Sequence, residues 1–175
     1  LIQAVVAVED ARFYSHPGFD LEAIARAALV NLQSGDIEEG ASTITQQLVK
    51  NLFLSPEQSL ERKMEELALA IDFEFRYSKN EILSLYLNTI YFGSGYYGIY
   101  DAAHGYFGKD PSQLSLPEAA MLAGIPNAPS LYSPYESFLM AKKRQFVVLD
   151  AMVRAGYIDE RTATGAKIEP LYLAH

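Results

Sequence analysis

The apolar residues of this chain recur mostly three or four positions apart, which is the spacing of one face of an α-helix. No stretch alternates apolar and polar residues long enough to predict a sheet, although the aromatic segment 86–100 is compatible with a short hairpin. Prolines and glycines at turn spacing in the segment 124–136 predict an ordered loop. We therefore expect a mainly α fold with eight or nine helices.

Four Ser-x-x-Glu or Ser-x-x-Gln boxes mark expected helix starts, because their side chains can satisfy the unpaired amides of a first turn. They begin at Ser55, Ser78, Ser115 and Ser133. Further N-cap candidates are Asp20, Ser42 and Asp159, while Gly35, Gly108 and Gly156 stand where helices could end.

The expected helix at residues 43–54 has an apolar side and an amide-rich polar side with one cation. Its start, Gly40 to Ser42, would present backbone amides and the positive end of the helix dipole, which suit a phosphate or carboxylate. The alternative is a solvated face behind an ordinary cap. The polar side consists of Thr43, Gln46, Gln47, Lys50 and Asn51.

The next expected helix is apolar on two sides, so Glu66 within it should be largely buried. A buried carboxylate needs a partner, and Arg62 and Lys63 lie four and three residues before Glu66, within helical reach. A structural ion pair and a functional one are both compatible with this spacing.

Glu9 and Asp10 follow the apolar run Val5 to Val8, at the edge of an apolar helix that would bring Phe13 one turn after Glu9. Such a position can raise a carboxylate's pKa by desolvation, which suits a general base. A pair of acids on an exposed helix is the alternative. His16 precedes Pro17 and is expected to anchor a loop by hydrogen bonds rather than to bind metal.

The length of 175 residues, half of them hydrophobic, predicts one domain spanning residues 1–175. A formal net charge of -8 argues against nucleic acid as a partner. No run of about eighteen apolar residues predicts a membrane span. The sequence opens at Leu1 within an apolar pattern, and we expect it to be one domain of a longer polypeptide with an anchor upstream.

Four strings together resemble the motifs of the peptidoglycan glycosyltransferases, the transglycosylase domain of class A penicillin-binding proteins and monofunctional transglycosylases (glycosyltransferase family 51). They are EDARFYSHPG, GASTITQQLVKN, RKMEE and KNEILSLYLNTIYFG, in the family's order. The resemblance implies a lysozyme-like helical fold with a large lobe and a small membrane-facing lobe. The segment 19–32, with Leu29 and Leu32, corresponds to the small lobe and could face the membrane or pack on the core.

By the same resemblance Glu9 matches the catalytic base and Glu66 a second carboxylate. The implied reaction is inverting transfer of a growing lipid-linked glycan chain to lipid II, forming a β-1,4 bond and releasing polyprenyl diphosphate. The implied substrate-binding residues are Ser42, Gln46, Gln47, Lys50, Asn51, Arg62, Lys63 and Arg144.

The resemblance requires no cofactor, although Glu66 could either position cations or, with Asp10, hold a divalent ion such as Mg²⁺ or Mn²⁺. It implies work at the extracytoplasmic face of the bacterial cytoplasmic membrane, with moenomycin-type inhibitors occupying the donor side. Gln58 and Gln145 replace basic residues common in the family, and Lys142 or Lys143 could compensate. The rivals are a glycan-cleaving muramidase and a helical scaffold without activity.

Overall fold

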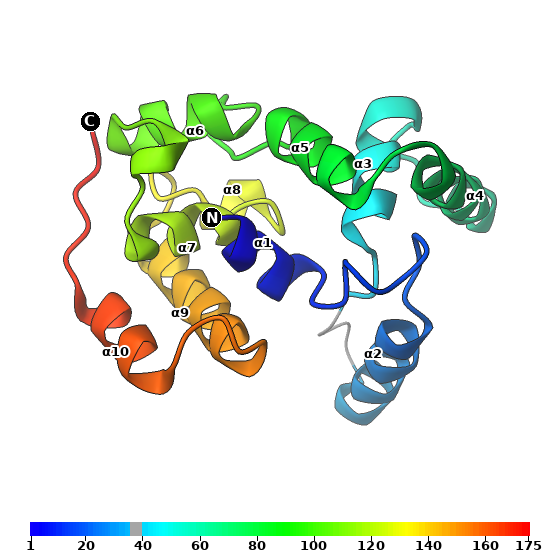
Figure 1. Ribbon diagram of the computed structural model, residues 1–175, viewed down its shortest axis with the longest axis horizontal. Helices are drawn as coiled ribbons and strands as arrows, with labels where there is room; N and C mark the ends of the chain where they lie inside the picture. Colours follow the sequence, from blue (N-terminus) through cyan, green and yellow to red (C-terminus); the bar gives the residue numbers. More distant parts are fainter. Residues whose placement is uncertain (36–39) are drawn as a thin grey trace. The chain divides into compact units, whose positions relative to one another are not determined.

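The computed structural model describes residues 1–35 and 40–175, which form α-helices and one short 3-10 helix but no strand (Figure 1). The expectation of a mainly α fold is confirmed. The helices are α1 (Ile2–Glu9), α2 (Leu21–Ser34), α3 (Ile44–Phe53), α4 (Leu60–Arg76), α5 (Lys79–Thr89), α6 (Ile99–Phe107), η1 (Pro111–Gln113), α7 (Leu116–Gly124), α8 (Pro129–Tyr132), α9 (Phe138–Arg154) and α10 (Glu160–Ile168).

Ten α-helices in the described residues exceed the eight or nine expected, partly because α8 lies inside the segment predicted to be a loop. Of the short hairpin with which segment 86–100 was compatible, the structure shows only the closing bridge. Helix α5 continues through Thr89, and a single antiparallel bridge then joins Tyr91 to Tyr97.

The capping predictions hold where the serine or aspartate side chain is available to the helix. Asp20, Ser78, Ser115 and Asp159 each accept hydrogen bonds from amides of the first turn that follows. The predicted starts at Ser55 and Ser133 are wrong, and the Ser42 prediction is displaced by one residue to Thr43.

The helices predicted to start at Ser55 and Ser133 start four residues later, with Ser59 and Ser137 as their N-caps. The hydroxyl of Ser55 instead accepts a hydrogen bond from Arg62 Nε, and that of Ser133 bonds to Tyr106. These tertiary contacts take the serines away from a capping role.

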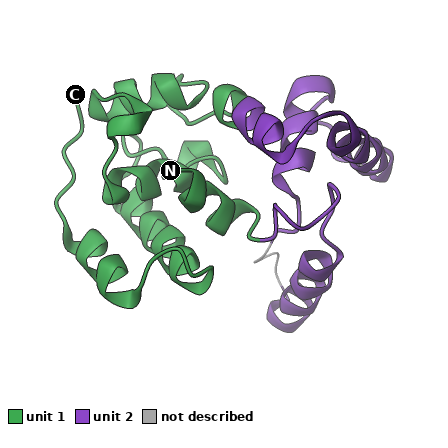
Figure 2. Ribbon diagram, viewed as in Figure 1, with its two compact units in different colours: residues 1–11, 87–175 green, residues 12–86 purple. Residues whose placement is uncertain are grey.

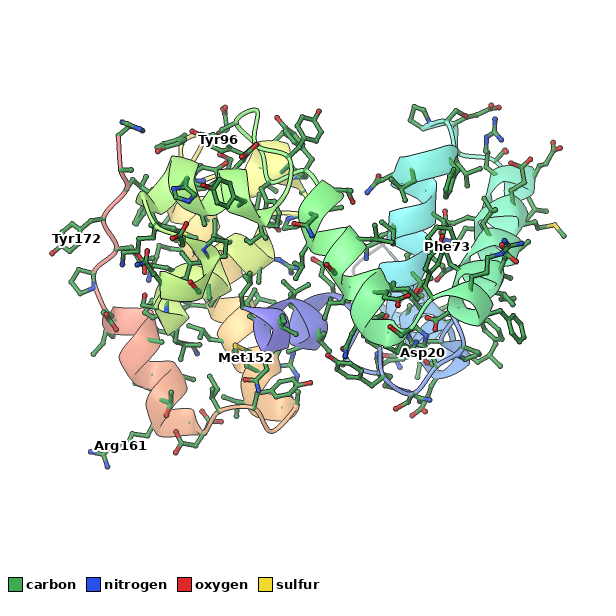
Figure 3. All side chains as sticks on the ribbon, turned by 45° about the horizontal axis from the view of Figure 1, so that its top comes forward. Asp20, Phe73, Tyr96, Met152, Arg161 and Tyr172 are labelled. Carbon is green, nitrogen blue, oxygen red and sulfur yellow. The ribbon has the colours of Figure 1, made fainter. Side chains whose placement is uncertain are left out.

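Two compact units divide the chain, residues 1–11 with 87–175 and residues 12–86 (Figure 2). In the larger unit, α9 packs against α1, α7, α8 and α10. Small side chains such as Ala4, Ala120 and Ala123 are fully buried and allow the helices to approach closely, while Met152 fills space on α9 (Figure 3).

The smaller unit is built around α3 and α4, which pack against each other and bury Ile44, Leu48 and Phe73. The ring of Phe73, labelled in Figure 3, lies on α4. It meets the ring of Phe53 edge to face, with centroids 5.7 Å apart. Helix α2 belongs to the same unit, capped by Asp20, and among its residues only Ala27 is buried.

The loop before α2 is held by His16, whose Nδ1 accepts a hydrogen bond from the Gly18 amide at 3.1 Å. Lys79 Nζ donates to the His16 carbonyl at 2.7 Å and to Glu74. Gly18 has φ +110° and lies against the Ala70 backbone, so a side chain there would be strained. The interpretation of His16 as a loop anchor is confirmed.

Within the described residues, no helix combines the length and apolarity needed to cross a membrane.

Candidate functional site

Glu9 is the last residue of α1, and Asp10 caps the helix with φ -161° and ψ 78°. The helix therefore stops before Phe13, and the expectation that it continues one turn past Glu9 is wrong. The Glu9 side chain is 6% exposed. It lies at the carboxyl end of a helix, where the dipole and the loss of water both oppose a negative charge.

Arg144 of α9 provides a cation for this carboxylate. Its Nη2 lies 4.0 Å from Glu9 Oε1, and its side chain is 15% exposed. The distance is too long for a hydrogen bond, so the contact is electrostatic. The sequence predicted that Arg144 binds substrate, and the structure places it beside the predicted base within the larger unit.

A second charged cluster lies in the smaller unit, where Lys63 is held between Ser42 and Glu66. Lys63 Nζ donates to Ser42 Oγ and to Glu66 Oε1, both at 2.9 Å. Glu66 is buried, with 8% of its side chain exposed, whereas 53% of the Lys63 side chain is exposed. The buried acid thus fixes an ammonium group that solvent or a ligand can reach.

The predicted pair of Arg62 with Glu66 is wrong. Arg62 Nη1 donates to Glu65 at 2.7 Å, and its Nε donates to Ser55 at 3.0 Å. Spacings of three and four residues are both within helical reach, and the orientation of each carboxylate decides between them. Of the two cations, Lys63 belongs to Glu66 and Arg62 to Glu65.

The polar residues of α3 divide into a structural and an exposed group. Gln46 is buried and closes the capping box, its Oε1 accepting from the Thr43 amide at 2.9 Å. Gln47 accepts from the Tyr86 hydroxyl at 3.0 Å. Lys50 and Asn51 are exposed. Lys50 is therefore the α3 cation that a phosphate in solvent could meet.

Gln58 and Gln145, which stand where the family commonly has basic residues, differ in their surroundings. Gln145 is completely buried, donating to the Pro117 carbonyl at 2.8 Å and accepting from Lys142 at 2.6 Å. Burial lowers the pKa of Lys142. Lys143 and Gln58 are exposed. Lys142 is thus bound to Gln145, so the predicted compensation would have to come from Lys143.

The described donor set does not fit a divalent cation well. No cluster of three or more His, Cys, Asp or Glu side chains with metal-binding geometry occurs in residues 1–35 and 40–175. Glu66, the candidate ligand, already binds the Lys63 ammonium. Asp10 is buried in the other unit. We derive no step through a metal.

Helix α2 is largely exposed and carries several exposed apolar side chains. Leu29 is 58% exposed and Leu32 82% exposed, and Leu21 and Ile24 are also exposed. Segment 19–32 could either face the membrane or pack on the core. The exposure of these leucines is not compatible with packing on the core.

Sequence reasoning missed three residues around the charged groups. Tyr132 and Gly124 border Arg144, and Glu65 binds Arg62. Glu65 could have been found, because it is three residues from Arg62. Tyr132 and Gly124 could not, because their proximity to Arg144 depends on how α7, α8 and α9 pack. A separate hollow of about 430 Å³ lies at Leu1, the opposite end of α1 from Glu9.

The family model described as Transglycosylase matches residues 1–153. Penicillin-binding protein 1A of Aquifex aeolicus is 50% identical over 98% of this chain, and a Cupriavidus necator protein named provisionally as a transglycosylase is 46% identical over 99%.

The chain spans 24% of the Aquifex protein and 74% of the Cupriavidus protein. The crystal structure of penicillin-binding protein 1A from Haemophilus influenzae superposes with a TM-score of 0.54 at 32% identity. That match covers 75% of this chain and 16% of the solved chain. It agrees with the mainly α fold.

Proposed function

Since this chain belongs to the transglycosylase family and its enzyme class is peptidoglycan glycosyltransferase, we propose that it polymerises lipid II by inverting transfer. The growing lipid-linked strand would be the donor, the new bond β-1,4, and the leaving group polyprenyl diphosphate. The observation that carries the proposal is Lys63, an accessible cation fixed by Ser42 and a buried Glu66. A diphosphate leaving group needs such a cation, whereas the muramidase reaction does not.

Glu9 is proposed as the general base that takes the proton of the acceptor hydroxyl. Its burial and its place at the carboxyl end of α1 both oppose its negative charge. Arg144 favours the ionised form before proton transfer. A base must be ionised at the start and able to accept a proton, and these opposing influences serve both needs.

The diphosphate is proposed to meet the cations of the smaller unit. Lys63 is ordered by two hydrogen bonds, and Lys50 and Arg62 lie on the same pair of packed helices, α3 and α4. A positioned cation stabilises the departing negative charge without reorganising during the reaction. Gln47 and Asn51 of α3 could contribute amide donors to the phosphate oxygens. Gln46 would act indirectly, by closing the cap of the helix.

Contact with the membrane surface is proposed for α2. The formal net charge of -8 opposes binding to anionic headgroups, so attraction has to be apolar and local. The exposed Leu21, Ile24, Leu29 and Leu32 supply such a surface. This fits a substrate whose lipid tail stays in the bilayer. It also fits work at the extracytoplasmic membrane face, with an anchor outside residues 1–175.

The proposal is tested by incubating the protein with lipid II and separating the products by gel electrophoresis. Glycan strands of increasing length, together with released diphosphate, are the expected result. Strand shortening of preformed glycan would favour the muramidase, and binding without turnover would favour the inactive scaffold. Competition by a moenomycin-type phosphoglycolipid would support the donor side at Lys63, and Lys63→Ala should weaken it.

A further inference from the structure

We propose that Tyr132 and Gly124 form a clamp that holds Arg144 beside Glu9, and that Arg144 is a positioning residue that keeps Glu9 ionised before proton transfer. The inference rests on the proposed role of Glu9 as general base. All four residues belong to the larger unit. They come from α1, α7, α8 and α9, and α9 packs against each of the other three helices.

The first observation is the separation of the two charges. Glu9 and Arg144 are both mostly withdrawn from solvent, and Nη2 and Oε1 lie 4.0 Å apart. A charge pair screened little by water interacts more strongly than one at the surface. At 4.0 Å the guanidinium favours the carboxylate without donating a hydrogen bond to that oxygen through Nη2. The Arg144 guanidinium can therefore stabilise the Glu9 carboxylate without a hydrogen bond from Nη2 to Oε1.

The second observation is the aromatic face against Arg144. Its guanidinium carbon lies 5.5 Å from the centroid of the Tyr132 ring. A guanidinium over a tyrosine face is attracted by the ring quadrupole, and the attraction is larger when the pair is desolvated. The Tyr132 ring on α8 therefore helps to hold the Arg144 guanidinium in place. This contact does not use the N–H groups of the guanidinium.

The third observation is the room made by Gly124. A Cβ at this position would meet Arg144 Cγ at 2.6 Å, closer than side chains tolerate. Gly124 ends α7 and is absent from the glycines with positive φ, so its backbone does not call for glycine. Space for the arginine stem is the remaining reason for a glycine here.

The fourth observation is a donor without an acceptor. Within the described parts of the chain, Arg144 Nε is buried and makes no hydrogen bond. Such a group costs stability, and its retention needs an explanation other than stability. Placing a cation near Glu9 supplies one.

Other charged groups on the packed helices are engaged elsewhere or exposed. On α7, Glu118 binds Lys109 and Ser115. On α9, Lys142 binds Gln145 and the Lys167 carbonyl, and Asp150 binds Lys167. Lys143 and Arg154 of α9 are exposed, and Asp10, next to Glu9 on the chain, is buried.

The central experiment titrates the Glu9 carboxyl by ¹³C NMR in the substrate-free protein, with Glu9→Gln to assign the signal. In Arg144→Gln the titration midpoint of Glu9 should rise, because a nearby positive charge is lost, and the acid limb of the pH–rate profile should move with it. Arg144→Lys, which keeps the charge, should recover part of the shift. An unchanged midpoint in Arg144→Gln would overturn the proposal, even if the rate fell uniformly through a structural defect.

The clamp is tested by Tyr132→Leu, which should lower the rate near neutral pH by about three- to tenfold and move the midpoint in the same direction. Tyr132→Phe should restore most of that loss, because the ring face is kept. Tyr172→Leu, at a tyrosine 80% exposed, is the matched control. Equal losses in the Phe and Leu variants would show that the hydroxyl matters, and the clamp would be wrong.

Failure of this inference differs from failure of the proposed function. If the Glu9 midpoint depends on Arg144 while Glu9→Gln still polymerises lipid II, the clamp stands and the base assignment is wrong. If Glu9→Gln is inactive but the titration midpoint of Glu9 is the same in Arg144→Gln as in the unsubstituted protein, the base assignment stands and the clamp is wrong. If Gly124→Ala leaves the titration midpoint of Glu9 unchanged, Gly124 is not part of the clamp.

Discussion

The two units hold their buried acids in different ways. Glu66 of the smaller unit is hydrogen-bonded at 2.9 Å to Lys63, which is bonded in turn to Ser42. Glu9 of the larger unit lies 4.0 Å from its arginine, outside hydrogen-bond distance. In the proposed function Glu66 positions the Lys63 ammonium, whereas Glu9 exchanges a proton beside a more distant guanidinium. The same residue type thus suits two roles because of what surrounds it.

The largest effect is expected from Glu9→Gln, which removes the proton acceptor while keeping the shape of the side chain. Polymerisation of lipid II should fall by roughly 10²- to 10⁴-fold, the range for a positioned general base. The melting temperature should stay near that of the unsubstituted protein. Turnover close to normal would contradict the contrast between the two acids, because Glu9, like Glu66, would then take no part in proton transfer.

Lys63→Ala should have the next largest effect, about 10²-fold on kcat, because it removes a positioned cation from the proposed leaving group. Glu66→Gln should lose less, since the amide oxygen can still accept from Lys63. Affinity for a moenomycin-type inhibitor should fall in Lys63→Ala and, to a smaller extent, in Lys50→Ala. Unchanged affinity in both lysine variants would remove them from the donor side.

A smaller effect is expected from replacing Leu29 and Leu32 with Asp. Both are exposed, so the melting temperature should hardly change. Vesicle binding and turnover of long-tailed lipid II should fall by about fivefold or more, with a short-tailed analogue spared. Gln33→Asp, on the same helix, controls for added charge. Equal losses on both substrates with a lowered melting temperature would place the membrane contact elsewhere.

The smallest effect concerns stability and not catalysis. Burial opposes the charge of Glu118, but hydrogen bonds from Lys109 and Ser115 outweigh it, so its pKa lies below the ordinary 4.5. Because the folded pKa is depressed, this stabilisation is present above the unfolded pKa and is lost as pH falls through the folded one. Glu118→Gln should lower the unfolding free energy by about 1 kcal/mol at pH 7, and by less near pH 3. Denaturant titrations at both pH values test this.

The sequence predicted best where local chemistry decides the structure. Helical periodicity gave the α-helical class, and Asp20 and Ser115 cap helices as expected because their partners lie within three residues. Glu66 was expected to be buried because its helix is apolar on two sides, and it is. Predictions failed where a distant contact decided. Ser133 bonds to Tyr106 instead of capping a helix, and no local pattern contains that information.

The site shows the same division. The pairing of Lys63 with Glu66 was within reach of helical spacing, but its third member, Ser42, comes from 21 residues earlier. Arg144 was singled out through a family resemblance, and its position beside Glu9 depends on the packing of α9 against α1. Family motifs identified the residues to consider. Their partners in space required the fold.

The larger unit is assembled from two stretches of chain, with the smaller unit encoded between them. Helix α1 packs on α9, which begins at Phe138, so Glu9 acquires these surroundings only after α9 has been made. At typical synthesis rates the intervening residues take on the order of ten seconds to emerge from a ribosome. During that time the nascent chain would carry Glu9 without Arg144 beside it. Premature termination before α9 should therefore yield no partially active enzyme.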